Sequence, residues 1–331
     1  MKILITGGAG YIGSLLTGAL LSQGHQVTVL DDLLFGGDAI LPYFIHPAFA
    51  FHKFDVTTGD LAPHLEGVGA VYHLAALVGF PACQRAGDEA SWAVNTGAVE
   101  RVFQAAEAAG VGRLVFSSTY SNYGIAPDNR PVDESSPLHP QSTYAETKIA
   151  AEQYLLGQAA TSRCAPLVYR FATLYGLSPR TRFDLLVNQF VLEAVTTHAL
   201  LIYQRRYARS FVHIRDVVRA LALALDAPEP LIRGEVYNVG SDDGNYTKEE
   251  LALLVAKHVP GTEITFKDMA FDGDMRDVRV SFAKITSRLG FRAAYDIEYG
   301  IREIRDALEL GLIKEPFNDR YRNAPSLLKG S

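Results

Sequence analysis

A glycine-rich turn near the start of the chain constrains its fold more than any other feature. Residues 6–13 read Thr-Gly-Gly-Ala-Gly-Tyr-Ile-Gly, between the apolar run Lys2–Thr6 and a stretch with helical apolar spacing over residues 11–23. A turn of this kind brings backbone without Cβ and the N–H groups of a helix N-terminus close to a pyrophosphate. The spacings G-x-G-x-x-G and G-x-x-G-x-x-G are both satisfied, and they predict a dinucleotide held by Gly7, Gly10, Tyr11, Ile12 and Gly13.

Short β-rich runs alternate with longer helical stretches through the first half of the chain. Strands are predicted over residues 2–6, 26–30, 49–54, 70–74, 113–117 and 166–170, and helices over 11–23, 89–109 and 142–160. This alternation predicts an α/β fold with a doubly wound parallel sheet of the Rossmann type.

The rhythm changes after about residue 175, where the pattern becomes irregular. Helices are predicted over 183–197, 214–226, 247–258, 281–289 and 298–311, with strand-like runs at 200–203 and 236–240. We therefore expect a Rossmann domain over residues 1–175, with a returning segment near 210–240, and a smaller mixed α/β substrate-binding lobe over residues 176–331.

Composition excludes several classes of function. The formal net charge of -6 argues against a broad basic face for nucleic acid. No apolar run reaches the roughly 18 residues that span a bilayer, so no membrane association is expected. The two cysteines, Cys83 and Cys164, are far apart and form no metal-ligand cluster, which predicts no metal site and a reducing, cytoplasmic environment.

An acidic residue ends the second predicted strand. Asp31 follows Gly13 by eighteen residues, where a carboxylate accepts hydrogen bonds from the ribose hydroxyls of NAD and repels the 2′-phosphate of NADP. No arginine stands nearby in the sequence, so the predicted cofactor is NAD. Asp32 is the alternative for the ribose contact.

Tyr144 and Lys148 form the candidate catalytic pair. They are four residues apart on a predicted helix, so both project from one helix face. A phenol with a pKa of about 10 is a poor base at neutral pH, and a nearby ammonium stabilises its phenolate. Such a pair exchanges a proton with an alcohol while hydride leaves the same carbon.

Hydroxyl groups follow the fifth predicted strand, in the run Ser117-Ser118-Thr119. Ligands meet doubly wound sheets at the carboxyl ends of the strands, so a hydroxyl there could hold the reacting oxygen. Thr119 is the first candidate and Ser118 the second.

Together these motifs resemble the extended short-chain dehydrogenase/reductase family, in its nucleotide-sugar epimerase/dehydratase branch. The resemblance covers nearly the whole chain, and its motifs specify the family more sharply than the reaction. It is carried by the glycine loop at 7–13, Asp31, Asp55-Val56, Leu74-Ala75-Ala76, Asn95, Ser117-Ser118-Thr119, Tyr144 with Lys148, Arg170–Gly176, Arg209–Asp216 and Tyr237–Gly240.

The resemblance implies NAD in the first domain and a nucleoside-diphosphate sugar in the second lobe. In that scheme Tyr144 takes the proton of the sugar 4-hydroxyl, Thr119 hydrogen-bonds the same oxygen, and Lys148 tunes Tyr144. The implied cofactor contacts add Asp55, Val56, Leu74, Ala75, Ala76, Asn95 and Ser117 to the glycine loop, Asp31 or Asp32, Tyr144 and Lys148. The implied substrate contacts are Val78, Ser118, Thr119, Thr173, Asn188, Arg209 and Arg276.

Departures from the family pattern narrow the expected reaction. Dehydratases of this branch carry Thr-Asp-Glu where this chain has Thr119-Tyr120-Ser121, so 4,6-dehydration is disfavoured, and decarboxylation is weakened for the same reason. The leading expectation is an NAD-dependent nucleotide-sugar 4-epimerase. The alternatives are a GDP- or UDP-linked sugar 4-dehydrogenase or reductase and a catalytically silent NAD sensor. Relatives pair helices such as 89–109 and 142–160, which implies a homodimer.

Overall fold

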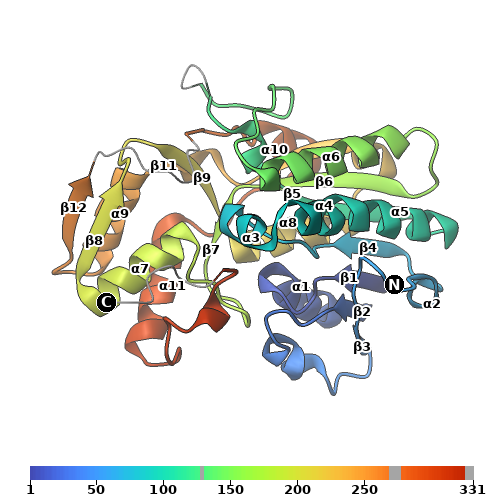
Figure 1. Cartoon of the computed structure of the whole chain (residues 1–331), viewed down its shortest axis with the longest axis horizontal. Coiled ribbons are helices and arrows are strands. Elements are labelled where there is room, and N and C mark those ends of the chain that lie inside the picture. The colour runs from blue at the N-terminus through green and yellow to red at the C-terminus, as the bar shows by residue number, and fades with distance from the viewer. Residues whose placement is uncertain (127–129, 268–276, 325–331) are drawn as a thin grey trace.

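Seven parallel strands form one sheet in a computed structural model that describes residues 1–126, 130–267 and 277–324 (Figure 1). The strand order is β10-β6-β5-β4-β1-β2-β3, and all neighbours run parallel. The strands are β1 (Lys2–Thr6), β2 (Gln26–Asp31), β3 (Phe49–Lys53), β4 (Ala70–His73), β5 (Arg113–Thr119), β6 (Ala165–Phe171) and β10 (Glu235–Val239). The predicted doubly wound α/β fold is confirmed.

Helices cover both faces of this sheet. The buried clusters place α1 (Tyr11–Ser22) and α8 (Ile214–Asp226) on one face, and α5 (Ala98–Ala108) and α6 (Thr143–Gln158) on the other. Shorter helices join these layers: α2 (Ala62–Leu65), α3 (Phe80–Ala86), α4 (Asp88–Trp92) and the 3-10 turns at Asp38–Tyr43, Tyr120–Tyr123 and Glu229–Leu231.

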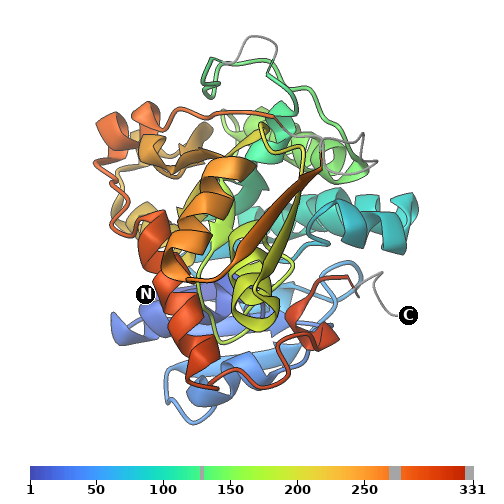
Figure 2. The same ribbon diagram turned by 90° about the vertical axis from the view of Figure 1, so that its left-hand side faces the viewer.

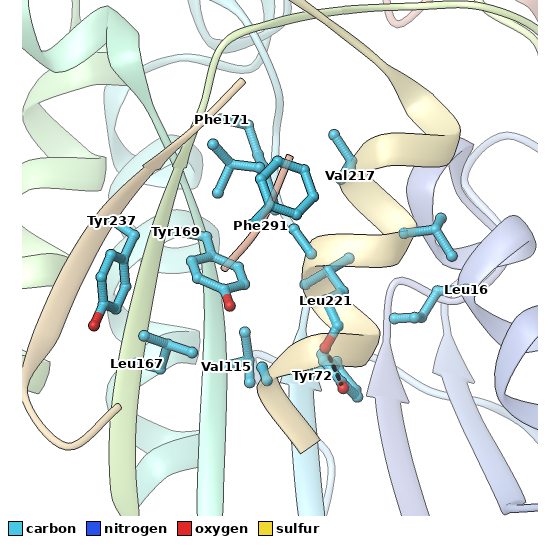
Figure 3. Close-up of a cluster of buried hydrophobic side chains, with 14 of the residues drawn as sticks. Leu16, Tyr72, Val115, Leu167, Tyr169, Phe171, Val217, Leu221, Tyr237 and Phe291 are labelled. Atoms are coloured by element: carbon cyan, nitrogen blue, oxygen red, sulfur yellow. Dashed lines mark hydrogen bonds between the residues drawn. The ribbon is translucent and has the colours of Figure 1, made fainter. Parts of the chain in front are cut away.

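The core beneath α8 is rich in aromatic side chains from the strands. Tyr72, Tyr169 and Tyr237 of the sheet lie in one buried cluster with Val217 and Leu221 of α8 (Figure 3). The Tyr72 hydroxyl donates to the Leu221 carbonyl at 2.7 Å, so its polar end is satisfied inside an apolar cluster. Helix α8 is therefore part of the main core, although it lies far along the chain from β4.

The remaining elements enclose a separate apolar cluster. A three-stranded sheet contains β7 (Thr173–Tyr175), β9 (Ala208–His213) and β11 (Asn245–Thr247), and a parallel pair contains β8 (Ala199–Tyr203) and β12 (Glu263–Lys267). The helices of this cluster are α7 (Leu186–Thr197), α9 (Lys248–His258) and α11 (Ile297–Glu309), and 3-10 turns lie at Asp242–Gly244 and Asp319–Tyr321. Helix α10 (Ala283–Leu289) instead packs against the main core through Ile285. Side chains of α7, α9 and α11 pack together in this cluster, which we term the outer core.

The structure departs from the predicted elements where local contacts override periodicity. The helix predicted over 89–109 is divided into α4 and α5 by a π-helical turn at Ala93–Gly97. Helix α7 begins at Leu186 rather than residue 183, because the Phe183 amide bonds the Tyr321 carbonyl at 2.8 Å. Strand β9 was not predicted, since its buried residues include Arg209, Ser210 and His213.

Within the described ranges no helix is both long and apolar enough to cross a membrane. Both cysteines are buried free thiols.

Candidate functional site

The strand order of the main sheet reverses between β1 and β4. β4 and β2 lie on opposite sides of β1, so the connections after β1 and after β4 leave the sheet in opposite directions. Ligands of doubly wound sheets bind outside the carboxyl ends of the strands at such a point. Residues 70–73 are fully buried, whereas residues 74–79 directly after them are half-buried. The chain is therefore open to a ligand at this edge.

The glycine turn is packed too tightly for side chains. Gly7 has a φ of +74°, and a Cβ there would lie 2.6 Å from the Ala75 amide nitrogen. A Cβ on Gly13 would lie 2.4 Å from the Gly7 carbonyl oxygen. Gly10 precedes the first residue of α1. The turn thus places bare backbone and a helix N-terminus beside Leu74 and Ala75, which fits a dinucleotide pyrophosphate.

Asp31 and Asp32 point to different surroundings. The Asp31 carboxylate accepts from the Ala9 amide at 3.0 Å and the Leu33 amide at 2.8 Å, and burial raises the pKa of Asp31 above its ordinary value. Asp32 is exposed and accepts from the Leu34 amide. Asp31 is therefore the carboxylate beside the glycine turn, and the structure favours it for a ribose contact.

No arginine is close to Asp31 in the sequence, but one is close to it in the fold. Arg180, distant along the chain, lies within electrostatic range of the Asp31 carboxylate. Its guanidinium is centred 4.1 Å from the ring of Phe35, in the segment that follows Asp31.

The predicted cofactor contacts beyond β2 divide into open and enclosed positions. Asp55 is exposed and bonds Thr57, whereas Val56 is buried. Leu74, Ala75, Ala76 and Ser117 are half-buried at the strand ends.

Asn95, another predicted cofactor contact, lies on the enclosed side of the strand ends. Its side chain is fully buried, with Oδ1 accepting from the Leu77 amide at 2.8 Å and Nδ2 donating to the Leu77 carbonyl and the Thr147 hydroxyl. These bonds hold the loop after β4 against α6, and the cofactor contact of Asn95 stays a prediction.

Tyr144 and Lys148 project from one face of α6, at the edge described above. The helix begins after Ser142, whose hydroxyl caps the Ala145 amide. Lys148 Nζ donates to the Ser117 carbonyl at 3.0 Å, which fixes the ammonium at the end of β5. Burial lowers the pKa of Lys148 to about 8, so the protein holds a desolvated cation one helical turn from the Tyr144 phenol.

Thr119 ends β5 and presents its hydroxyl within a small hydroxyl cluster. Thr119 Oγ1 lies 2.9 Å from Ser121 Oγ and accepts from the Ser121 amide at 3.1 Å. The Tyr120 hydroxyl lies 2.7 Å from the Thr173 hydroxyl, so Thr173 is linked to the same turn. The positions after Thr119 therefore carry hydroxyls where a dehydratase needs carboxyl groups.

Ser118, the second candidate for the reacting oxygen, lies in a buried polar network. Its hydroxyl donates to Glu152 Oε1, and the same carboxylate accepts from Asn122 at 2.8 Å and from Arg170 at 2.6 Å. All four side chains are buried. Ser118 belongs to this network on the inner side of α6, and the substrate contacts of Ser118 and Thr119 stay predictions.

The Glu152 network leads to a stability prediction. Glu152→Gln leaves the buried Arg170 cation without its carboxylate, so we expect the free energy of unfolding to fall by about 3 kcal/mol. Thermal unfolding with Glu146→Gln, an exposed position on the same helix, is the matched control. Equal melting temperatures for the two variants would contradict the role given to Glu152.

A cavity adjoins Tyr144 on the side of α3. It has a volume of about 290 Å³ and is lined by Phe80, Cys83, Gln84, Gly87, Asp88, Thr143 and Tyr144. Sequence reasoning selected Val78 from this region, whose carbonyl accepts from Asn323 at 3.4 Å, and missed the residues of α3. The sequence feature that could have indicated these residues is that α3 closely follows the fourth strand.

Arg182 is a further residue that sequence reasoning missed. Its guanidinium forms a bidentate pair with Asp184, at 3.0 and 2.8 Å, and lies within electrostatic range of the Tyr144 and Tyr11 phenols. The Arg-Thr-Arg-Phe-Asp pattern at 180–184 was the available signal.

Asn188, a predicted substrate contact, is bonded to the backbone of its own segment, and its substrate contact stays a prediction. It is fully buried, and its amide bonds the Gly176 backbone on both sides and the Arg182 carbonyl. The Tyr11 hydroxyl donates to the same Gly176 carbonyl at 2.7 Å, so Asn188 helps to fix the 176–182 loop on α1. Arg209 is buried in β9, and Arg276 lies outside the described residues.

Comparison with known proteins yields one family. The model of the NAD dependent epimerase/dehydratase family matches residues 3–240. A UDP-glucose 4-epimerase of Corynebacterium glutamicum is 28% identical over 88% of this chain and 90% of its own length. A dTDP-glucose 4,6-dehydratase of an Actinoplanes species is 31% identical over 92% of this chain and 96% of its own.

A solved structure with the same architecture is MoeE5 in complex with UDP-glucuronic acid and NAD. It superimposes with a TM-score of 0.81 at 27% identity, over 94% of this chain and 100% of that one.

Proposed function

The chain belongs to the NAD dependent epimerase/dehydratase family, and from this premise we propose that it is a nucleotide-sugar 4-epimerase acting through oxidation and reduction at C4. The family is NAD-dependent, and its members here include nucleotide-sugar epimerases and dehydratases. The observation that carries the proposal is the Tyr144–Lys148 pair, whose ammonium is fixed on the Ser117 carbonyl at the open end of β5.

The protein's own groups supply the proton chemistry. NAD, when bound, supplies the hydride acceptor and donor. The Tyr144 phenol takes the 4-hydroxyl proton and later returns it, and the Lys148 cation lowers the free energy of the phenolate. The Thr119 hydroxyl orients the same oxygen. The residues that would hold NAD are those of the glycine turn, Asp31 and the strand-end run 74–76.

We propose that the part of the chain over residues 176–331 holds the nucleotide sugar together with the open end of the sheet. Thr173 and Val78 lie near the strand ends, and Arg209 is the proposed contact for the nucleotide. The cavity beside Tyr144 would receive a substituent of the sugar, since Gln84, Asp88 and Thr143 give it polar walls. Arg276 remains a proposed diphosphate contact.

Net oxidation or reduction at C4 is the second candidate, because it would use the same proton transfer by Tyr144 and, like epimerisation, needs no carboxyl group at the two positions after Thr119. Incubating the protein with UDP- and GDP-sugars and resolving the products separates the candidates. A C4 epimer formed without added cofactor supports the epimerase. A released 4-keto sugar with stoichiometric reduced NAD overturns it in favour of a dehydrogenase. Binding of NAD with no product from either the UDP- or the GDP-sugars would leave a catalytically silent NAD sensor as the remaining candidate.

We also propose a homodimer formed through α5 and α6, which lie side by side on the outside of the sheet (Figure 1). Light scattering should give twice the mass of one chain. Gly157→Arg on α6 should give a monomer, because no atom lies within 4 Å of a Cβ there and the side chain fits one chain but not a close helix pair. A wild-type monomer at micromolar concentration would contradict the proposal.

A further inference from the structure

Arg180 is a buried cation whose hydrogen-bond partners are neutral. Its side chain is part of a residue only 7% exposed, with Nη1 donating to Asn323 Oδ1 at 2.7 Å and Nη2 to the Arg322 carbonyl at 3.0 Å. Its Nε is buried and has no hydrogen-bond partner among the residues that the structure describes. Burial of a guanidinium is costly unless an anion and acceptors surround it. Arg180 therefore has a buried donor that the described residues leave without an acceptor.

The position of Arg180 indicates which part of a ligand would accept a hydrogen bond from its guanidinium. Its guanidinium stacks on Phe35, four residues beyond Asp31. Its own amide donates to Ser178 Oγ at 3.3 Å, and that hydroxyl donates to the Tyr11 carbonyl at 2.7 Å. Arg180 thus sits between the end of β2 and the first residue of α1. These two places would hold the ribose and the pyrophosphate of the adenosine half of a dinucleotide.

The surroundings of Arg180 are open enough for part of a ligand. A cavity of about 240 Å³ adjoins it, lined by Phe35, Gly36, Asp38, Ala39, Pro179, Arg180, Thr181, Arg320 and Tyr321. The cavity joins residues after β2 with residues from the 179–181 loop and the C-terminal segment. Figure 1 and Figure 2 both place the red C-terminal segment beside the blue N-terminal part.

We propose that Arg180 is a cofactor-binding residue that reaches the adenosine diphosphate half of NAD from outside the N-terminal half of the chain. A guanidinium suits this role, because its donors match phosphate and ribose oxygens and its charge offsets the pyrophosphate. The charge also lies within range of Asp31, so one cation serves both the ribose carboxylate and the ligand. Burial and the neighbouring Arg182 cation lower the pKa of Arg180 to about 10, although the Asp184 and Asp31 carboxylates act in the opposite direction.

The C-terminal segment holds the guanidinium in place. The Asn323 amide nitrogen donates to Asp184 at 3.1 Å, the Asn323 side chain donates to the Val78 carbonyl at 3.4 Å, and the Tyr321 carbonyl accepts from Phe183. Asn323 is therefore a positioning residue, tied to the loop after β4 on one side and to Arg180 on the other.

The test measures binding of NAD and of ADP-ribose, without any sugar, to wild-type protein and to Arg180→Gln. Losing a charge-assisted hydrogen bond should weaken both ligands by about 10- to 100-fold, and Asn323→Ala should weaken both by less. Nicotinamide mononucleotide should bind equally to all forms. Arg320→Gln is the matched control, because Arg320 lines the same cavity but is exposed and bonds Tyr321.

Arg180→Lys keeps the charge without the Nε donor and serves if Arg180→Gln fails to fold. Intermediate weakening of NAD and ADP-ribose in this variant supports the proposal. Unchanged binding in a folded Arg180 variant, or equal loss in Arg320→Gln, overturns it and leaves Arg180 a packing residue. Since no sugar is present, the result is independent of whether the chain epimerises its substrate.

Discussion

Tyr144→Phe is expected to lower turnover of the nucleotide sugar by about 10³-fold while leaving NAD affinity nearly unchanged. The substitution removes one oxygen, the proposed proton acceptor, from a side chain that is 9% exposed. The ring still fills its place beside the cavity of Phe80 and Thr143, so the fold and the cofactor groove should persist. Steady-state turnover and calorimetric NAD binding on the same preparation provide the measurement.

Tyr154→Phe is the matched control for this loss. Tyr154 lies on the same helix, and its hydroxyl accepts a hydrogen bond from Gln104 at 3.3 Å on the outer surface. Turnover by this variant should equal that of the wild type. Retained turnover in Tyr144→Phe would remove the proposed proton transfer.

Lys148→Met is expected to lower turnover by about 10²-fold or more and, at the same time, to raise the stability of cofactor-free protein. The phenolate of Tyr144 loses its cation, which slows proton transfer. The folded protein, however, no longer desolvates a charge. A pKa displaced from 10.5 to about 8 corresponds to roughly 3 kcal/mol of destabilisation at neutral pH. The variant also loses the hydrogen bond to the Ser117 carbonyl and the contact with the Phe116 ring, and these losses offset about half of the stability gained.

The pH dependence of stability distinguishes this cause from packing. The unfolded chain binds the Lys148 proton more tightly than the folded chain, so the wild-type deficit is complete below about pH 8. It fades as the pH rises from about 8 toward 10.5. The difference in melting temperature between Lys148→Met and the wild type should therefore shrink over that interval. Lys53→Met, at an exposed position, should show no such change. A variant no more stable than the wild type at pH 7 would contradict the desolvation argument.

The sheet was predictable because each strand of the first half is a compact apolar run between glycine and polar breaks. The seventh strand was predicted as an element near 236–240, in a segment expected to return to the first domain, but its pairing with β6 was not predicted. β9 escaped prediction because it buries charged and polar residues, which periodicity assigns to the surface. The π-helical turn at 93–97 was equally invisible, since its residues continue the helical pattern.

The candidate site was predictable where motif and position coincide, as at the glycine turn, Tyr144 and Lys148. It was not predictable where a side chain has a polar neighbour from another part of the chain. Asn95, Ser118 and Asn188 are polar residues in the expected segments, yet the hydrogen bonds that they form in the fold were not predicted. Arg180 and Arg182 reach the cofactor edge only through tertiary structure, so no local pattern around Asp31 could reveal them.

The late position of α8 and β10 has a consequence for synthesis on the ribosome. A nascent chain that has emerged only as far as β6 carries Tyr72 and Tyr169 on a face that Val217, Leu221 and Tyr237 have yet to cover. At roughly 5–20 residues per second, this aromatic surface stays exposed for several seconds before α8 and β10 emerge from the ribosome. Expression at lower temperature or with a chaperone that shields nascent chains should therefore improve the soluble yield.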